Sequence, residues 1–261
     1  MLQKHNFHMV DMSPWPVLTG MCLFGVFAGL LNWFYFFSFW FLFYSLLSVI
    51  LICIQWWRDV IREATYIGCH VNLVMKGLQY GMVMFISSEV LFFFGFFWTF
   101  FHSFLSPTCE LGMEWPPLGV NSFDPEQVPL LNSLILLSSG VSVTWAHHSM
   151  LEKKFEEAKI SLLVTVMLGM YFTLLQMYEY YDAQYSISDS IFGACFFVAT
   201  GFHGLHVIIG TLFLSVMLYR LLGYQFSSQN HVGFESSAWY WHFVDVVWLF
   251  LYVIVYWWTF S

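Results

Sequence analysis

The residues most able to carry chemistry in this chain lie inside long apolar stretches. Glu89 stands in the run SSEVLFFFGFFWTFFH, with no Lys or Arg available at that depth. An ionisable side chain inside a membrane costs about 2.5–3.5 kcal/mol on insertion scales, and such residues are functional by default. Two interpretations stay open: a carboxyl that exchanges protons, or one held neutral by desolvation and hydrogen-bonded to a neighbouring helix.

A second polar group comes from two later runs. His203 and His206 occur in GFHGLHVIIG, and Glu235, His242 and Asp245 occur in ESSAWYWHFVDVVW. Positions three or four apart share one helix face, so we expect these five residues to form a structural polar network between two helices. Two His and a carboxylate are also a common metal ligand set. Because di-iron bundles use Glu-x-x-His motifs and this chain has none, we favour the network and expect no metal.

Two smaller groups in the same runs have structural explanations. His147 and His148 end another apolar run, where we expect them to cap a helix C-terminus. Gly201, Gly204 and Gly210 are expected to permit close helix packing, which holds helices together where lipid removes the hydrophobic driving force.

The elements that carry these residues must be transmembrane helices. Hydrophobic residues make up 59% of the chain and charged residues 9%, against about 25% charged in soluble domains. A helix needs about 20 apolar residues to cross a bilayer. The sequence predicts seven such spans, at 15–35, 40–58, 73–105, 129–149, 159–181, 190–221 and 235–258, with a tight hairpin near Asn32 to Phe39.

The basic residues predict the orientation of these spans. All eight stand at or beside alternate breaks: Lys4, Arg58, Arg62, Lys76, Lys153, Lys154, Lys159 and Arg220. The positive-inside rule then places the N-terminus on the cytoplasm-equivalent side. The connections on the other side carry acids only: Glu110, Glu114, Asp124, Glu126, Asp182 and Asp189. An acidic face disfavours nucleic acid and suits a basic protein docking nearby.

The cysteines and the N-terminal residues argue against disulfide, thiolate-metal and targeting functions. The five cysteines form no C-x-x-C pair, so neither a disulfide framework nor a thiolate metal site is expected. The segment MLQKHNFHMVDMSPWP resembles no removable signal or presequence. We expect insertion where the chain is made, in a bacterium or in an organelle with its own ribosomes.

Several sequence blocks together resemble subunit 3 of the cytochrome c oxidases, in the haem-copper oxidase family. They are WWRDVIRE (56–63), SEVLFF with GFFW and FHSFLSP (88–107), ELGMEWPPLG (110–119), PLLN (129–132), GVSVTWAHHS (140–149), ATGFHGLHVIIGT (199–211) and AWYWHFVDVVWLFLY (238–252). The resemblance implies an all-α integral membrane protein of seven helices. It also implies that residues 1–70, with the first two helices, stand apart from the five-helix bundle of residues 71–261 across a cleft filled by phospholipid.

The same resemblance implies a non-catalytic subunit of a respiratory oxidase in the mitochondrial inner membrane, with its N-terminus in the matrix. Haem and copper would belong to the catalytic subunits 1 and 2, which pass electrons from cytochrome c to oxygen and pump protons. Smaller accessory subunits and bound phospholipids would be further partners. This chain would support assembly, stability and proton uptake without a cofactor of its own.

Four residues near one membrane boundary suggest a lipid site, and the intramembrane polar residues leave two alternative functions. Trp57, Arg62, His70 and Arg220 fall at the matrix boundary of the predicted spans, where each basic residue interacts with anionic head groups by about 1 kcal/mol. We expect these four residues to bind phospholipid. The rivals are a haem protein that carries electrons, which needs His from two helices such as His206 and His242, and a proton-coupled transporter that uses Glu89 and Asp245.

Overall fold

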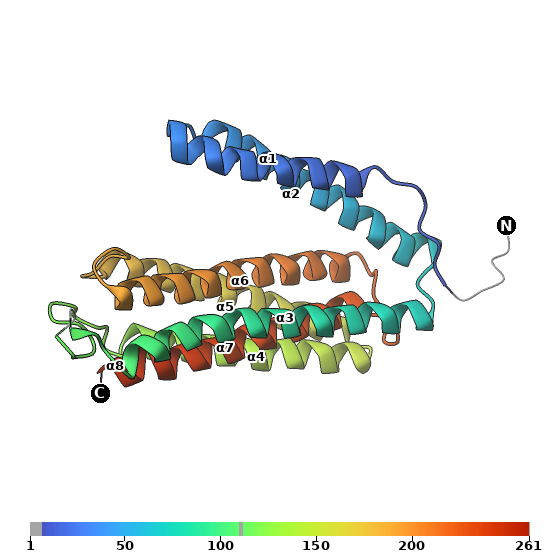
Figure 1. Ribbon diagram of the computed structural model, residues 1–261. Helices are drawn as coiled ribbons and strands as arrows, with labels where there is room; N and C mark the ends of the chain where they lie inside the picture. Colours follow the sequence, from blue (N-terminus) through green and yellow to red (C-terminus); the bar gives the residue numbers. More distant parts are fainter. Residues whose placement is uncertain (1–6, 110–111, 261) are drawn as a thin grey trace. The chain divides into compact units, whose positions relative to one another are not determined.

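All regular structure in the described part of the chain is helical. The computed structural model describes residues 7–109 and 112–260 (Figure 1). Seven of its helical stretches are long and apolar enough to cross a membrane, which confirms the predicted fold class. Their helices are α1 (Trp15–Phe36), α2 (Trp40–Arg62), α3 (Asn72–Phe104), α4 (Val128–Leu151), α5 (Phe155–Asp182), α6 (Ile191–Leu222) and α7 (Val232–Leu251).

The second stretch is longer than the sequence predicts. We expected it to end at residue 58, but α2 reaches Arg62 and continues as a π-helical segment, Glu63–Ile67. Charged residues lower the hydropathy there without interrupting the backbone hydrogen bonds, so the helix extends beyond its apolar part. It ends at Gly68, whose φ of +72° is the left-handed conformation that glycine adopts at helix C-termini.

The chain divides into two compact units, Met1–Leu78 and Gln79–Ser261. The sequence-based division after residue 70 stays a prediction, and the two compact units divide within α3, between Leu78 and Gln79. In the first unit, α1 and α2 form the predicted hairpin, and Phe37 makes the turn with a φ of +53°. At Gly29 a Cβ would lie 2.7 Å from the Leu42 Cα, so only glycine lets the two helices approach this closely.

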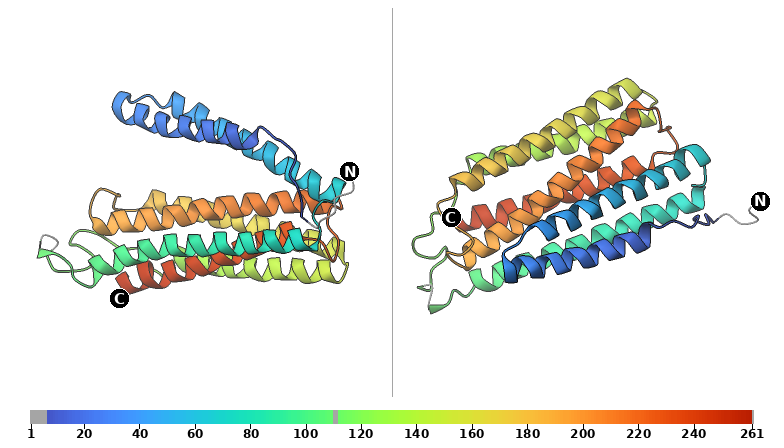
Figure 2. Two further views of the ribbon diagram at one scale, coloured as in Figure 1. Left: turned by 45° about the vertical axis from the view of Figure 1, so that its right-hand side comes forward. Right: turned by 90° about the horizontal axis from the view of Figure 1, so that it is seen from above.

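The second unit is a helix bundle. Helix α4 packs against α5 and α7, and α6 packs against the same two helices (Figure 2). Phe93 and Phe100 of α3 join the same hydrophobic core. The last stretch continues from α7 through a π-helical segment, Tyr252–Trp257, into the short α8, Trp258–Phe260.

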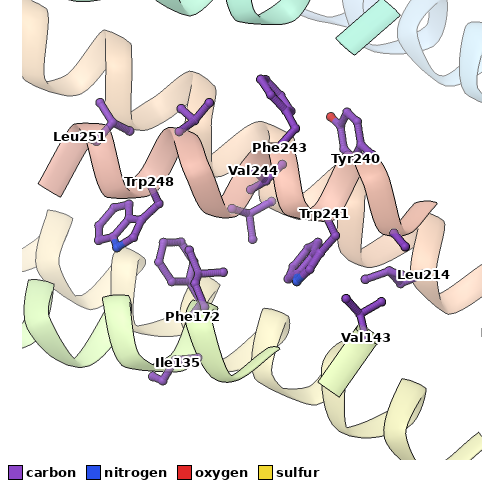
Figure 3. Packing of buried hydrophobic residues seen from close by; sticks show 14 of the residues in the cluster. Ile135, Val143, Phe172, Leu214, Tyr240, Trp241, Phe243, Val244, Trp248 and Leu251 are labelled. Atoms are coloured by element: carbon purple, nitrogen blue, oxygen red, sulfur yellow. The ribbon is translucent and has the colours of Figure 1, made fainter. Parts of the chain in front are cut away.

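Two buried tryptophans of α7 lie at the centre of this bundle (Figure 3). The Trp241 Nε1 donates to the Ser139 Oγ of α4 at 2.8 Å, and the Trp248 Nε1 donates to the Ser133 Oγ at 3.0 Å. Each indole therefore fills the core and satisfies its only polar atom. The serines of α4, which look merely polar in the sequence, serve as acceptors for these indoles.

Among the described contacts, one of the three glycines expected to permit close helix packing has that role. At Gly210 an added Cβ would lie 2.8 Å from the Trp241 ring, so this glycine admits the indole. At Gly201 the nearest atom would be the Tyr180 hydroxyl at 3.8 Å, and at Gly204 no described atom would lie within 4 Å. The close approach on α5 instead uses Gly169, whose added Cβ would overlap Trp241 and Thr211.

The four basic residues of the second unit lie at one end of its bundle. Lys153 and Lys154 connect α4 to α5, and Arg220 is in the last turn of α6. The Lys159 Nζ, near the start of α5, donates to the Tyr224 hydroxyl at 3.2 Å, which joins the beginning of α5 to the α6–α7 connection. These positions agree with the predicted clustering of basic residues; Lys4 lies outside the described residues.

The connections at the opposite end carry acids. Glu114, Asp124 and Glu126 lie between α3 and α4, and Asp189 lies between α5 and α6. The Asn121 amide donates to the Gln184 Oε1 at 2.8 Å, so these two connections meet. Glu110 falls outside the described residues. The second unit therefore has one end that carries its basic residues and one end without them.

Candidate functional site

Glu89, the acid singled out within the third span, is paired with a histidine of α6. Its Oε2 lies 3.0 Å from the Nε2 of His206. The other ring nitrogen of His206 lies 2.7 Å from the Phe202 carbonyl oxygen. A carbonyl only accepts hydrogen bonds, so the Nδ1 of His206 carries a proton.

This geometry leaves one further proton between Glu89 and His206. The pair is either a protonated carboxyl that donates to a neutral imidazole, or a carboxylate that accepts from an imidazolium. Both forms have no net charge, and each makes the same hydrogen bond. Rings of Phe93 and Tyr240 lie 5.1 and 6.2 Å from the imidazole ring, so the surroundings of the pair are largely apolar.

The five residues expected to form one network make contacts in different places. Glu89, not His242, is the partner of His206. The Nε2 of His203 donates to the Val244 carbonyl of α7 at 3.2 Å, which is a bond between helices. His242 and Asp245 face each other along α7, with their nearest ring nitrogen and carboxyl oxygen 3.6 Å apart.

Asp245 is packed against α4. The residue is 6% exposed, and a Cβ on Gly140 would lie 2.8 Å from its Oδ2. Its Oδ1 has no hydrogen-bond partner among the described residues. The absence of a side chain at Gly140 thus makes room for a carboxyl whose only described ionic neighbour is His242.

The fifth member, Glu235, lies in the first turn of α7 at the end that carries the basic residues. Its Oε2 accepts a hydrogen bond from the Gln79 Nε2 at 2.7 Å, and its Oε1 lies 3.4 Å from the His231 Nε2. That nitrogen is also 3.3 Å from the Nε2 of His147. The described contact of His147 is therefore with the N-cap residue of α7, and not with the carbonyls that end α4.

The four residues expected to bind lipid fall in different units. Trp57, Arg62 and His70 belong to the first unit, where Trp57 and Arg62 are exposed. Arg220 belongs to the second unit and is 9% exposed. Its Nε donates to the Gln225 Oε1 at 3.1 Å, and its guanidinium lies 4.4 Å from the centre of the Phe226 ring.

A buried polar group on α5 was missed in the sequence. Glu179 is 2% exposed, the Tyr256 hydroxyl lies near its carboxyl, and the Gln176 amide lies near that hydroxyl. Both carboxyl oxygens lack a hydrogen bond of normal geometry within the described residues. Because Glu179 is two residues from the predicted end of its span, it resembles an ordinary boundary acid. The available signal was the spacing of Gln176 and Glu179, which puts both on one helix face.

Comparison with known proteins adds a match along nearly the whole chain. The family described as Cytochrome c oxidase subunit III matches residues 5–260. The chain is 58% identical over 255 residues to Cytochrome c oxidase subunit 3 of Locusta migratoria, which covers 98% of this chain and 97% of that protein. It is 56% identical to the protein of the same name from Struthio camelus and 58% identical to that from Branchiostoma lanceolatum, each over 256 residues and 98% of both chains. The chain belongs to the cytochrome c oxidase subunit III family.

Proposed function

We propose that this chain is a structural subunit of the respiratory oxidase and that the chain itself carries no haem or copper. We place it in the mitochondrial inner membrane with its N-terminus in the matrix. The match to the family over residues 5–260 carries the proposal. Membership of that family makes the chain an accessory subunit of an oxidoreductase complex. Catalytic subunits 1 and 2 and smaller accessory subunits are the proposed partners.

The contacts of the intramembrane histidines support a structural role. A histidine that binds haem iron presents a free ring nitrogen to the metal. Both ring nitrogens of His206 face protein acceptors or donors, Phe202 on one side and Glu89 on the other. The Nε2 of His203 bonds a backbone carbonyl. The haem-carrier alternative, built on His206 and His242, would require the Glu89 contact to break.

The transporter alternative is weakened by the same contacts. Glu89 is bonded to His206, and Asp245 is packed against Gly140, so each carboxyl has a fixed protein neighbour. Asp245 belongs to α7 and Glu89 to α3, and each pairs with a different histidine. We infer that these pairs stabilise the helix bundle. Support of proton uptake by the complex is proposed from family membership alone.

The proposed orientation rests on the ends of the second unit. Lys153, Lys154, Lys159 and Arg220 share one end, and by the positive-inside rule this is the matrix end. The phospholipid site of Trp57, Arg62, His70 and Arg220 is part of the proposal, because the spans predicted from the sequence put all four residues at the matrix boundary. Replacing Arg62 and Arg220 with Ala should lower the amount of phospholipid retained by the purified complex, measured by mass spectrometry.

Isolation of the chain with its partners tests the proposed function. Mitochondrial membranes are solubilised in mild detergent, and the chain is captured by a tag at its C-terminus. We expect haem-bearing subunits in the captured material and no haem absorbance after the chain is separated from them. Haem that stays with the separated chain, or capture of the chain without any haem-bearing partner, would contradict the proposal.

A further inference from the structure

His147, His231 and Glu235 form a compact group at the end of the second unit that carries its basic residues. His147 is in the last turns of α4, His231 immediately precedes α7, and Glu235 is in the first turn of α7. One ligand atom from each residue lies within 4.8 Å of the others. We propose that these three side chains form a binding site for Zn²⁺.

The separations within the group match those of a tetrahedral zinc site. Ligands held at about 2.0–2.1 Å from a tetrahedral ion lie about 3.3–3.4 Å apart. The Nε2 atoms of His147 and His231 are 3.3 Å apart, and the His231 Nε2 is 3.4 Å from the Glu235 Oε1. Two imidazoles and one carboxylate are a donor set that Zn²⁺ accepts, with water in the fourth position.

His231 is held in the tautomer that binds a metal. Its Nδ1 lies 3.0 Å from the Ser227 carbonyl oxygen, which only accepts, so this nitrogen carries the proton. In the neutral ring the lone pair is then on Nε2, the atom that faces His147 and Glu235. A ring N–H given to a backbone carbonyl is the usual way in which proteins orient a metal-binding histidine. The ring is also 4% exposed, which fixes its position.

Glu235 is oriented in the same manner. Its Oε2 accepts from the Gln79 Nε2 at 2.7 Å, which leaves Oε1 turned toward the two histidines. Gln79 is therefore a positioning residue for the carboxylate. The side chain of Glu235 is 22% exposed, so the group is open to water on one side and an aqueous ion can reach it.

The first unit contains a comparable group, His8, Glu63 and His70, for which the argument is weaker. The His8 Nε2 lies 3.1 Å from the Glu63 Oε2, but the His8 Nδ1 is buried without a hydrogen-bond partner among the described residues. No carbonyl therefore fixes the tautomer of His8. The orientation of both His231 and Glu235 by neighbouring groups distinguishes the site on α4 and α7.

Zinc binding to the purified complex tests the proposal. The wild-type complex and variants are treated with a chelator, equilibrated with zinc chloride alone, passed over a desalting column and analysed for zinc per mole of this chain. We expect wild type to retain one zinc more than His231→Gln and Glu235→Gln. The Gln79→Leu variant should bind that zinc about 10–100-fold more weakly, because outer groups that orient ligands contribute by this factor.

The matched control is His148→Gln, which removes the neighbouring, exposed histidine of α4. It should retain the wild-type zinc content. If His231→Gln fails to assemble, Glu235→Gln decides alone, since glutamine fills the same volume. X-ray absorption at the zinc edge should show nitrogen and oxygen ligands in the wild-type complex. The signal from this zinc should be absent in Glu235→Gln. Equal zinc content in wild type and Glu235→Gln, or equal loss in His148→Gln, overturns the proposal.

Discussion

The Glu89 Oε2 and the His206 Nε2 lie 3.0 Å apart and join α3 to α6 within the apolar part of the second unit. The residues are 117 positions apart in the chain. Because the Nδ1 of His206 already donates to the Phe202 carbonyl, the bond to Glu89 requires a single shared proton. The two side chains therefore depend on each other, and neither is satisfied alone.

Replacing His206 should be more harmful than replacing Glu89 with its amide. In His206→Leu the carboxyl loses its partner inside the apolar span, and an unsatisfied polar group kept from water costs about 1–3 kcal/mol. In Glu89→Gln the amide still donates to the imidazole, so the loss should be near the roughly 0.6 kcal/mol measured for bonds between membrane helices. Thermal unfolding of the purified complex would compare the two variants.

The double variant Glu89→Leu with His206→Leu provides the control. Because both polar partners are then absent, it should be more stable than His206→Leu alone. If Glu89→Gln is as destabilising as His206→Leu, the shared-proton bond is not the important interaction.

The glycines that contact Trp241 should tolerate alanine poorly. Gly169→Ala and Gly210→Ala each place a methyl group against the indole, and overpacking of this kind costs about 1–3 kcal/mol. Gly204→Ala is the matched control on α6, because its methyl group meets no described atom within 4 Å. It should be neutral or stabilising by up to about 1 kcal/mol, since alanine favours helix. Similar melting temperatures for Gly204→Ala and Gly210→Ala would contradict this packing.

Two tyrosines of the second unit should respond in opposite ways to phenylalanine. The Tyr180 hydroxyl is 2.7 Å from the Thr200 Oγ1, so Tyr180→Phe should cost about 0.5–1.5 kcal/mol. The Tyr185 hydroxyl is buried with no partner among the described residues, so Tyr185→Phe should be neutral or stabilising. Denaturation of the two variants under identical conditions makes the comparison, and a larger loss for Tyr185→Phe would contradict it.

Tyr185 should also contribute to alkaline sensitivity. Burial, and then the nearby Glu179, raise the pKa of Tyr185, which lies between α5 and α6. Above the usual tyrosine pKa of about 10 the unfolded chain loses this proton while the folded chain retains it, so folding stability falls as pH rises. The Tyr185→Phe variant should lose less stability than wild type above that pH. Parallel pH curves for the two proteins would rule out this contribution.

The ends of the second unit should be reachable from opposite sides of the membrane. In sealed mitoplasts, Cys109 should react with an impermeant maleimide, while Lys153 and Lys154 should react with an impermeant amine reagent only after the membrane is opened. The exposed thiol lies in the connection that carries Glu114 and Asp124, and the lysines lie between α4 and α5. Labelling of both sets before opening would contradict the orientation.

The seven helices could be predicted because the signals that define them are local. The length of the first apolar run predicted a span at 15–35, and α1 is Trp15–Phe36. The alternate clusters of basic residues predicted which connections share an end. The length of α2 could not be predicted from hydropathy, since the π-helical segment beyond Arg62 is held by backbone bonds and not by apolar residues.

The partners of the polar residues could not be predicted for a different reason. Spacing shows that His203 and His206 share a face of α6, but the rotation of α6 against its neighbours is decided by packing. The Trp241 indole, admitted by Gly169 and Gly210, is part of that packing. As a result His206 faces Glu89 of α3, where the sequence predicted a network with His242. His147 and His231 are also in contact, although no motif in the sequence indicated it.

The π-helical segment Tyr252–Trp257 leaves the end of the last stretch facing the bundle. Thr259 follows Trp241 by 18 residues, which is about five full turns of an α-helix, and both residues are buried whereas Trp258 is 47% exposed. Deleting a single residue here would leave the apolar composition of the span almost unchanged and yet rotate everything that follows by about 100°. Thr259 would then turn outward, so the buried positions beyond Leu251 depend on the length of the segment as well as on its composition.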